Sequence, residues 1–146
     1  MTRVLPLSAL AVFGALACFP GPYGRVTEVV SSAVPGDSIR VIVVVAGESE
    51  DTDLRIAAQV RDQLNAAGLT ALRRPGLWDS EQSALAEICP RDQPSDVDGV
   101  LFVWWNQLEL RECPTHRPAY QIRGGYTGVN AMVKRLLRYL RVTPAG

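Results

Sequence analysis

The sequence predicts one α/β domain built on a mixed sheet, with two or three layers of secondary structure. Two apolar runs, IRVIVVVA at 39–46 and DGVLFVWW at 98–105, are typical of strands buried on both faces. Two other segments, 51–67 and 129–140, carry apolar residues at helical spacing. A chain of 146 residues with 47% hydrophobic content is long enough for one such domain and too short for two ordinary ones.

The expected element order is β-α-β-α-β-β-β-α, within a domain that covers 39–143. The first strand, 39–46, is followed by a helix over 51–67. Gly68 ends this helix, because glycine readily adopts the left-handed conformation found at helix C-termini. The next element is a strand at 69–73.

The second half of the domain is predicted from a cap, a hairpin and an amphipathic helix. Asp79-Ser80-Glu81-Gln82 resembles a capping box, and Pro90 ends the short helix that it opens. After the strand at 98–105, apolar and polar residues alternate at 108–111 and 120–123, which predicts an antiparallel hairpin around the turn CPTHRP. Thr127 is available as the N-cap of the last helix.

Residues 1–17 have the three parts of a secretory signal peptide. Arg3 supplies a positive start, an uncharged apolar run follows, and Ala15 and Ala17 satisfy the small-x-small cleavage pattern. A retained membrane helix is the alternative, but it needs about 20 apolar residues, and prolines interrupt both ends of this run. The sequence therefore predicts export.

The next residue, Cys18, closes the segment GALAC, which resembles a bacterial lipobox. The resemblance implies that the sulfur of Cys18 is lipidated and that Cys18 becomes the new N-terminus. Ala15 stands where leucine is usual, and the same letters also permit ordinary cleavage and a soluble, secreted or periplasmic protein. Phe19 in place of an aspartate favours the outer membrane. Residues 18–38 are expected to form mainly a flexible tether rich in proline, glycine and serine, and a short strand or a short helix over 25–34 is left open.

The chain contains three cysteines, and an odd number in an exported protein leaves one to be explained. Lipidation accounts for Cys18, and Cys89 and Cys113 are then expected to form one disulfide in an oxidising compartment. The alternative is a metal site, since Cys113 and His116 have C-x-x-H spacing and Cys89 offers a third ligand. A fourth ligand is missing from the pattern, so no metal is predicted, and His116 is expected in an exposed turn.

Four features are candidates for binding, although each also has a plain structural role. Acidic residues follow the first strand, where ligands of open α/β sheets bind and where carboxylates also stabilise a helix N-terminus. The loop GGYTG at 124–128 enters a helix but lacks a phosphate-binding fingerprint. Of Trp104 and Trp105, one indole is expected in the core and the other exposed. A basic face on the last helix can meet lipid headgroups, a partner or solvent. The residues concerned are Glu48, Glu50, Asp51, Asp53, Trp105, Lys134, Arg135, Arg138 and Arg141, and we select Glu48, Asp51, Trp105 and Arg138 as candidate binding residues.

Charge gives no general argument for a nucleic-acid partner, because the formal net charge is zero. The distribution is uneven. Residues 47–99 hold eleven acids against five arginines (net −6), and residues 107–146 hold seven bases against two acids (net +5). No catalytic, metal or cofactor motif is present, so a non-enzymatic role is expected.

The element order, together with the predicted signal peptide, resembles that of bacterial envelope lipoproteins with small α/β domains. Examples are the curli-secretion lipoprotein and the amino-terminal domain of the Tol-system translocation protein. The residues that carry this resemblance are the DGVLFV strand, the LELREC-PTHRPAYQIRGG hairpin and the amphipathic helix that closes the domain. The resemblance implies a binding or assembly module that faces the periplasm, held to the membrane by its lipid, with another envelope protein as its partner. It leaves the oligomeric state open.

A second resemblance points to a different class. The segment VIVVVAGESEDTDLRIAAQVRDQLNAAGLTALR is similar to the opening of Toll/interleukin-receptor-type domains. Enzymes of that class, like other Rossmann-like nucleotide-binding domains, act on a nucleotide, and the resemblance leaves Glu81 or Glu87 as the catalytic glutamate. Export argues against this alternative, because the nucleotide on which such enzymes act is found in the cytosol.

Overall fold

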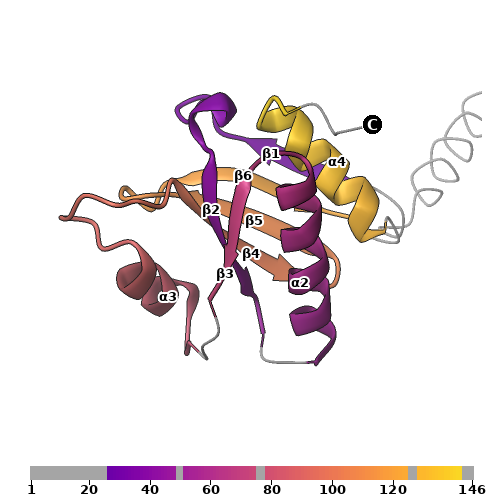
Figure 1. Ribbon diagram of the computed structural model, residues 1–146, viewed down its shortest axis with the longest axis horizontal. Helices are drawn as coiled ribbons and strands as arrows, with labels where there is room; N and C mark the ends of the chain where they lie inside the picture. Colours follow the sequence, from indigo (N-terminus) through magenta and orange to yellow (C-terminus); the bar gives the residue numbers. More distant parts are fainter. Residues whose placement is uncertain (1–25, 49–50, 75–77, 125–127, 143–146) are drawn as a thin grey trace, which may run out of the picture.

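The computed structural model describes residues 26–48, 51–74, 78–124 and 128–142, which form one domain with a six-stranded mixed sheet (Figure 1). The α/β class and the predicted order from the first buried strand onward are confirmed. The strands are β1 (Thr27–Val30), β2 (Val41–Ala46), β3 (Thr70–Arg73), β4 (Gly99–Trp104), β5 (Gln107–Glu112) and β6 (Pro118–Arg123). The helices are α2 (Asp51–Ala66), α3 (Glu81–Ile88) and α4 (Val129–Tyr139), with a 3-10 turn, η1, at Gly36–Ser38.

The two apolar runs form neighbouring strands in the middle of the sheet. The strand order is β1-β6-β5-β4-β2-β3, in which β2 pairs in parallel with both β3 and β4. From β4 onward the chain folds back on itself, so β4, β5 and β6 pair antiparallel, and β1 from the start of the domain pairs antiparallel with β6. Ile42 to Val45 of β2 and Gly99 to Val103 of β4 are buried, which explains why both runs lack polar alternation.

Side-chain alternation divides the core into two clusters, one on each face of the sheet. On one face α2 and α4 lie side by side and cover Ile42, Leu101, Leu110 and Ile122 among others (Figure 1). On the other face α3 covers Val43, Val45, Val100 and Phe102. The domain therefore has three layers around β2 and β4, α3 reaches β5 through Glu81, and no described helix covers the second face of β6 and β1.

Local signals set the helix ends largely as predicted. Gly68 follows α2 with a φ of 96°, a conformation that glycine adopts without strain. Ser80 is the N-cap of α3, and its hydroxyl accepts a hydrogen bond from the Ser83 amide at 3.1 Å. The N-cap of α4 is Gly128, which makes no side-chain cap, and Thr127 lies outside the described residues.

The prediction of a tether as far as residue 38 is wrong for its second half. Thr27–Val30 forms strand β1, which pairs antiparallel with β6 at the end of the sheet. Val34 is buried, its carbonyl accepts a hydrogen bond from the Tyr139 hydroxyl at 2.8 Å, and the backbone of Gly36 lies against that of Tyr139. A four-residue strand exposed on both faces has no apolar periodicity, so the sequence left 25–34 open between a short strand and a short helix.

The expected signal peptide, Cys18 and the first part of the tether belong to residues 1–25, which lie outside the described residues. Among the helices that are described, none combines the length and apolar character needed to cross a bilayer.

Replacing Gly36→Ala tests whether this segment is part of the domain. A Cβ atom at this position would overlap the backbone carbonyl of Tyr139. We expect the free energy of unfolding, measured by urea denaturation, to fall by about 1–3 kcal/mol because backbone has to shift. Ser32→Ala, an exposed change in the same segment, should stay within about 0.5 kcal/mol of the wild type. Equal stability of the two variants would show that Gly36 does not pack against α4.

Candidate functional site

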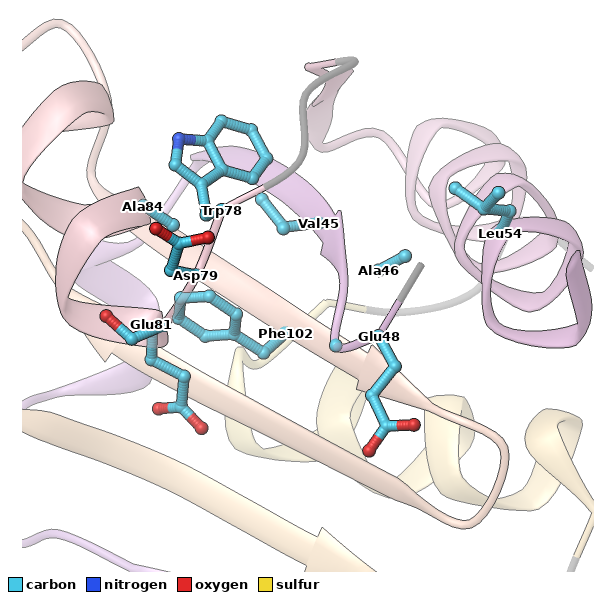
Figure 2. Close-up of a pocket in the computed structure, with 11 residues that line it drawn as sticks. Val45, Ala46, Glu48, Leu54, Trp78, Asp79, Glu81, Ala84 and Phe102 are labelled. Atoms are coloured by element: carbon cyan, nitrogen blue, oxygen red, sulfur yellow. The ribbon is translucent and has the colours of Figure 1, made fainter. Parts of the chain in front are cut away.

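A pocket of about 320 Å³ lies beside the carboxyl end of β2, between α2 and α3 (Figure 2). This is the edge of a parallel sheet where ligands of α/β domains usually bind. Its walls combine carboxylates with aromatic and aliphatic side chains. The residues that line it are Val45, Ala46, Gly47, Glu48, Leu54, Trp78, Asp79, Ser80, Glu81, Ala84 and Phe102.

The pocket is shaped where β2 ends and α3 begins. Gly47 allows the Trp104 indole to lie directly against the backbone, since any Cβ there would overlap the ring. The Gly47 amide continues the pairing with β4 by donating to the Val103 carbonyl at 2.7 Å. On the α3 side, the Trp78 indole N–H donates to the Glu87 carboxylate at 2.7 Å. Both tryptophans are thus held in place by neighbouring groups.

Glu81 connects the pocket to two charged residues of β5. The guanidinium Nη2 of Arg111 lies 2.8 Å from Oε1 of Glu109 and 3.7 Å from Oε2 of Glu81. The three side chains therefore form one cluster of two carboxyl groups and one cation. Burial raises the pKa of Glu81, the charge of Glu109 and a hydrogen bond with it raise the pKa further, and Arg111 opposes the shift.

Glu109 and Arg111 were missed as site residues because they alternate with Leu108 and Leu110. That pattern predicted a solvent-facing side of the hairpin, yet Glu109 is only 9% exposed. The available signal was two opposite charges two residues apart on one strand face. It did not reveal that α3 brings Glu81 to the same place.

The four predicted binding residues do not form one site. Glu48 lines the pocket, whereas exposed Asp51 lines a separate open hollow that includes Arg73. Trp105 is in the turn between β4 and β5 and is 60% exposed, and Trp104 packs against the second core cluster, as expected for adjacent residues. Arg138 is exposed on α4.

The remaining acidic residues also separate. Asp53 is buried in the first turn of α2, and Glu50 lies outside the described residues. In the described ranges no group of three or more histidine, cysteine or acidic side chains is arranged to hold a metal ion.

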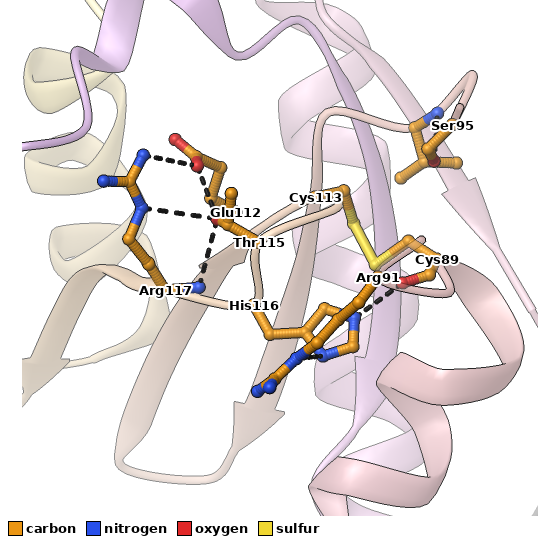
Figure 3. The surroundings of a disulfide bond; sticks show 9 residues. Cys89, Arg91, Ser95, Glu112, Cys113, Thr115, His116 and Arg117 are labelled. Atoms are coloured by element: carbon orange, nitrogen blue, oxygen red, sulfur yellow. Dashed lines mark hydrogen bonds and ion pairs between the residues drawn. A yellow bond between two sulfur atoms is a disulfide. The ribbon is translucent and has the colours of Figure 1, made fainter. Parts of the chain in front are cut away.

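Cys89 and Cys113 form the predicted disulfide, with their Cα atoms 5.8 Å apart (Figure 3). The bond joins the C-terminal end of α3 to the loop between β5 and β6. The Cys113 amide donates to the Asp98 carbonyl at 2.9 Å, which holds this loop at the start of β4. The disulfide thus connects α3 to the sheet at the opposite end of the helix from Glu81.

His116 supports the same junction instead of lying free in an exposed turn. Its Nδ1 accepts from Arg91 at 3.2 Å, so its Nε2 carries the proton and donates to the Cys89 carbonyl at 2.6 Å (Figure 3). The alternative metal site is wrong for this state of the protein, because both sulfurs are bonded to each other.

No known family model matches this chain, and no curated protein matches it significantly. The function therefore has to be inferred from its own residues.

Removing the disulfide should lower stability. The double replacement Cys89→Ala and Cys113→Ala opens a loop between cysteines 24 residues apart. The chain-entropy model gives a loss of about 3 kcal/mol in the free energy of unfolding. Urea denaturation of this variant and of the oxidised wild type, with thiol alkylation and mass measurement to verify the redox state, checks the prediction. An unchanged midpoint would mean that the bond does not constrain the unfolded chain.

The carboxyl group of Glu81 should titrate above the ordinary range for glutamate. Because its pKa is raised in the folded state, its contribution to stability is complete below the ordinary glutamate pKa and is lost as pH rises through the raised value. Carboxyl-carbon NMR titration measures this pKa directly, and Glu109→Gln should lower it by removing the neighbouring charge.

The matched control for this titration is Asp62→Asn on α2, an exposed carboxylate outside the cluster. It should leave the Glu81 titration unchanged. If Glu109→Gln has no more effect than this control, Glu109 does not influence Glu81.

Proposed function

We propose that this chain is an exported envelope protein held to a membrane by a lipid on Cys18, and that its α/β domain is a non-catalytic binding or assembly module. The disulfide between Cys89 and Cys113 is the observation that carries the proposal. Structural disulfides persist in oxidising compartments such as the periplasm and are rare in the cytosol. Export accounts for the apolar leader as well, and Cys18 is then the one cysteine not used by the domain.

The position of β1 refines how such an anchor would work. Nine residues lead from Cys18 to Thr27, the first residue of β1, so the anchor and the sheet can be at most about 30 Å apart. The domain would therefore stay close to the membrane surface. With Phe19 after the cysteine, we propose the outer membrane as the location and the periplasm as the compartment that the domain faces.

The absence of an assembled catalytic group in the candidate site favours binding over catalysis. Among the described residues of the pocket, Glu48, Asp79 and Glu81 are carboxylates and Ser80 is the N-cap of α3. No histidine or cysteine lines the pocket to form a nucleophile and base pair, because the one described histidine supports the disulfide.

Nucleotide binding or hydrolysis is the second candidate, and one observation favours it. The pocket of about 320 Å³ includes both Glu48 and Glu81 and lies where an α/β sheet binds nucleotides. The charges oppose this use, because the described walls present three carboxylates and no arginine or lysine to a phosphate. The sheet also departs from an all-parallel doubly wound fold after β4, where three antiparallel strands follow.

The anchor is tested by acylation and fractionation of the full chain expressed in a bacterium. Wild-type protein labelled with an alkyne fatty acid should appear in the membrane fraction, with an intact mass that starts at acylated Cys18. Cys18→Ser should lose the label and leave that fraction, because the acylated sulfur is removed. The pair Cys89→Ala and Cys113→Ala should keep the label, which controls for cysteine loss. Soluble wild-type protein with an unmodified Cys18 would disprove the anchor.

A further inference from the structure

The two edge strands of the sheet, β3 and β1, differ in whether their outward backbone groups have hydrogen-bond partners. At the β3 edge, the side-chain amide of Asn65 occupies the outward backbone groups of Ala71. The Ala71 amide donates to Asn65 Oδ1 at 2.8 Å, and Asn65 Nδ2 donates to the Ala71 carbonyl at 3.0 Å. Helix α2 therefore covers this edge at Ala71, and covering an edge strand is one way in which proteins prevent further pairing.

The β1 edge has no such cover in the described part of the chain. The Ser31 amide donates to the Ala119 carbonyl at 3.0 Å, and backbone groups alternate in direction along an antiparallel strand. The amide and carbonyl groups of Glu28 and Val30 therefore point away from β6. The side chains of Val29 and Val30 are 57% and 51% exposed and lie on opposite faces of the sheet. Among the described residues this edge is therefore unpaired, and its two valines are exposed.

Two arginines of α4 and a third just after the helix carry charge on the helix side of the same edge. Arg135 and Arg138 are three residues apart on α4 and so lie along one side of the helix, and Arg141 follows just beyond the end of α4. Arg135 pairs with Glu28 at 3.1 Å, and Arg141 lies 3.7 Å from Asp37. Arg138 lies between them, is exposed, and pairs with no carboxylate among the described residues. The α4 side of the open edge therefore carries a positive charge without a partner.

We propose that β1 receives an added strand from another protein, and that this strand carries acidic side chains on the face toward α4 and apolar side chains on the other. Main-chain hydrogen bonds to Glu28 and Val30 would supply affinity, and the alternate side chains would supply specificity. An acidic side chain of the added strand would form an ion pair with Arg138. An apolar side chain next to Val29 would face a hollow of about 320 Å³ whose lining also includes Pro118 and Ala119, together with the charged residues Glu109 and Arg117. The proposal rests on the domain being a binding module and names the chemistry of its partner.

A second copy of this chain fits the edge less well. Antiparallel pairing of two β1 strands would bring two α4 helices together across the two-fold axis, each with its Arg138 unneutralised. A four-residue strand is also short, whereas a stable interface buries about 1,200–2,000 Å² in total. An acidic strand makes the same backbone bonds and neutralises the charge.

The test uses the full mature chain in detergent and two synthetic peptides, acetyl-TEVEVET-amide and its lysine counterpart acetyl-TKVKVKT-amide. Titration followed by amide NMR should show binding of the acidic peptide, with slowed hydrogen exchange at Glu28 and Val30. The lysine peptide should bind at least about tenfold more weakly, because its cations face Arg138. Equal binding of both peptides, or no binding at millimolar concentration, would overturn the proposal.

Matched variants separate backbone pairing from charge. Val30→Pro removes an outward amide without disturbing the bonds to β6 and should weaken binding about tenfold, whereas Val30→Thr keeps the amide and should bind like wild type. Arg138→Gln should weaken binding about two- to fivefold. Lys134→Gln should not, because Lys134 lines the groove between α4 and α2. Full binding by Val30→Pro would exclude strand addition at β1.

Two further readouts identify other outcomes. Sedimentation of the wild type without peptide should show a monomer. A dimer that is lost in Val30→Pro would mean that the strand added at β1 comes from a second copy of this chain. Membrane fractionation of Val30→Pro should match the wild type, because anchoring depends on Cys18. Loss of peptide binding with normal fractionation therefore bears on the edge alone, and failure of acylation at Cys18 bears on the anchor alone.

Discussion

The parallel pairing of β2 with β4 is the contact on which the other elements depend. Their side chains are buried on both faces, so each face needs its own cover, α2 and α4 on one and α3 on the other. The carboxylate of Asp98, next to β4, accepts hydrogen bonds from the amides of Arg40 and Val41 at 2.8 and 2.9 Å. These bonds join the start of β2 to the start of β4 and set the register of the pair. The pocket lies at the opposite, carboxyl end of β2.

Helix α3 is short and buries only a small apolar face, so polar and covalent contacts contribute much of its attachment. At its N-terminal end Glu81 meets Glu109 and Arg111 of β5, and at its C-terminal end Cys89 is bonded to Cys113. One wall of the pocket is formed by this helix and the residues just before it. The position of this wall therefore depends on how α3 is held at its two ends, by the Glu81 cluster and by the disulfide.

The asymmetry of the sheet edges connects the fold to the proposed role. Asn65 covers the β3 edge at Ala71, while β1 presents two exposed valines and outward backbone groups with no partner among the described residues. Since β1 starts nine residues after Cys18, this edge is also the part of the sheet whose chain leads most directly to the proposed anchor.

The sequence by itself determined the buried strands, the main helices, the hairpin and the possibility of a disulfide. These features depend on local periodicity, on cap and stop residues, and on the number of cysteines, all of which can be read along the chain. Of the candidate site it identified Glu48 but grouped it with Asp51, which lines a different hollow. Only the tertiary structure decided that β1 joins the sheet, that Glu81 meets Glu109 and Arg111, and that Arg138 lies between two paired arginines. Each of these depends on contacts between residues far apart in the sequence, for which a single chain of letters carries no periodic signal.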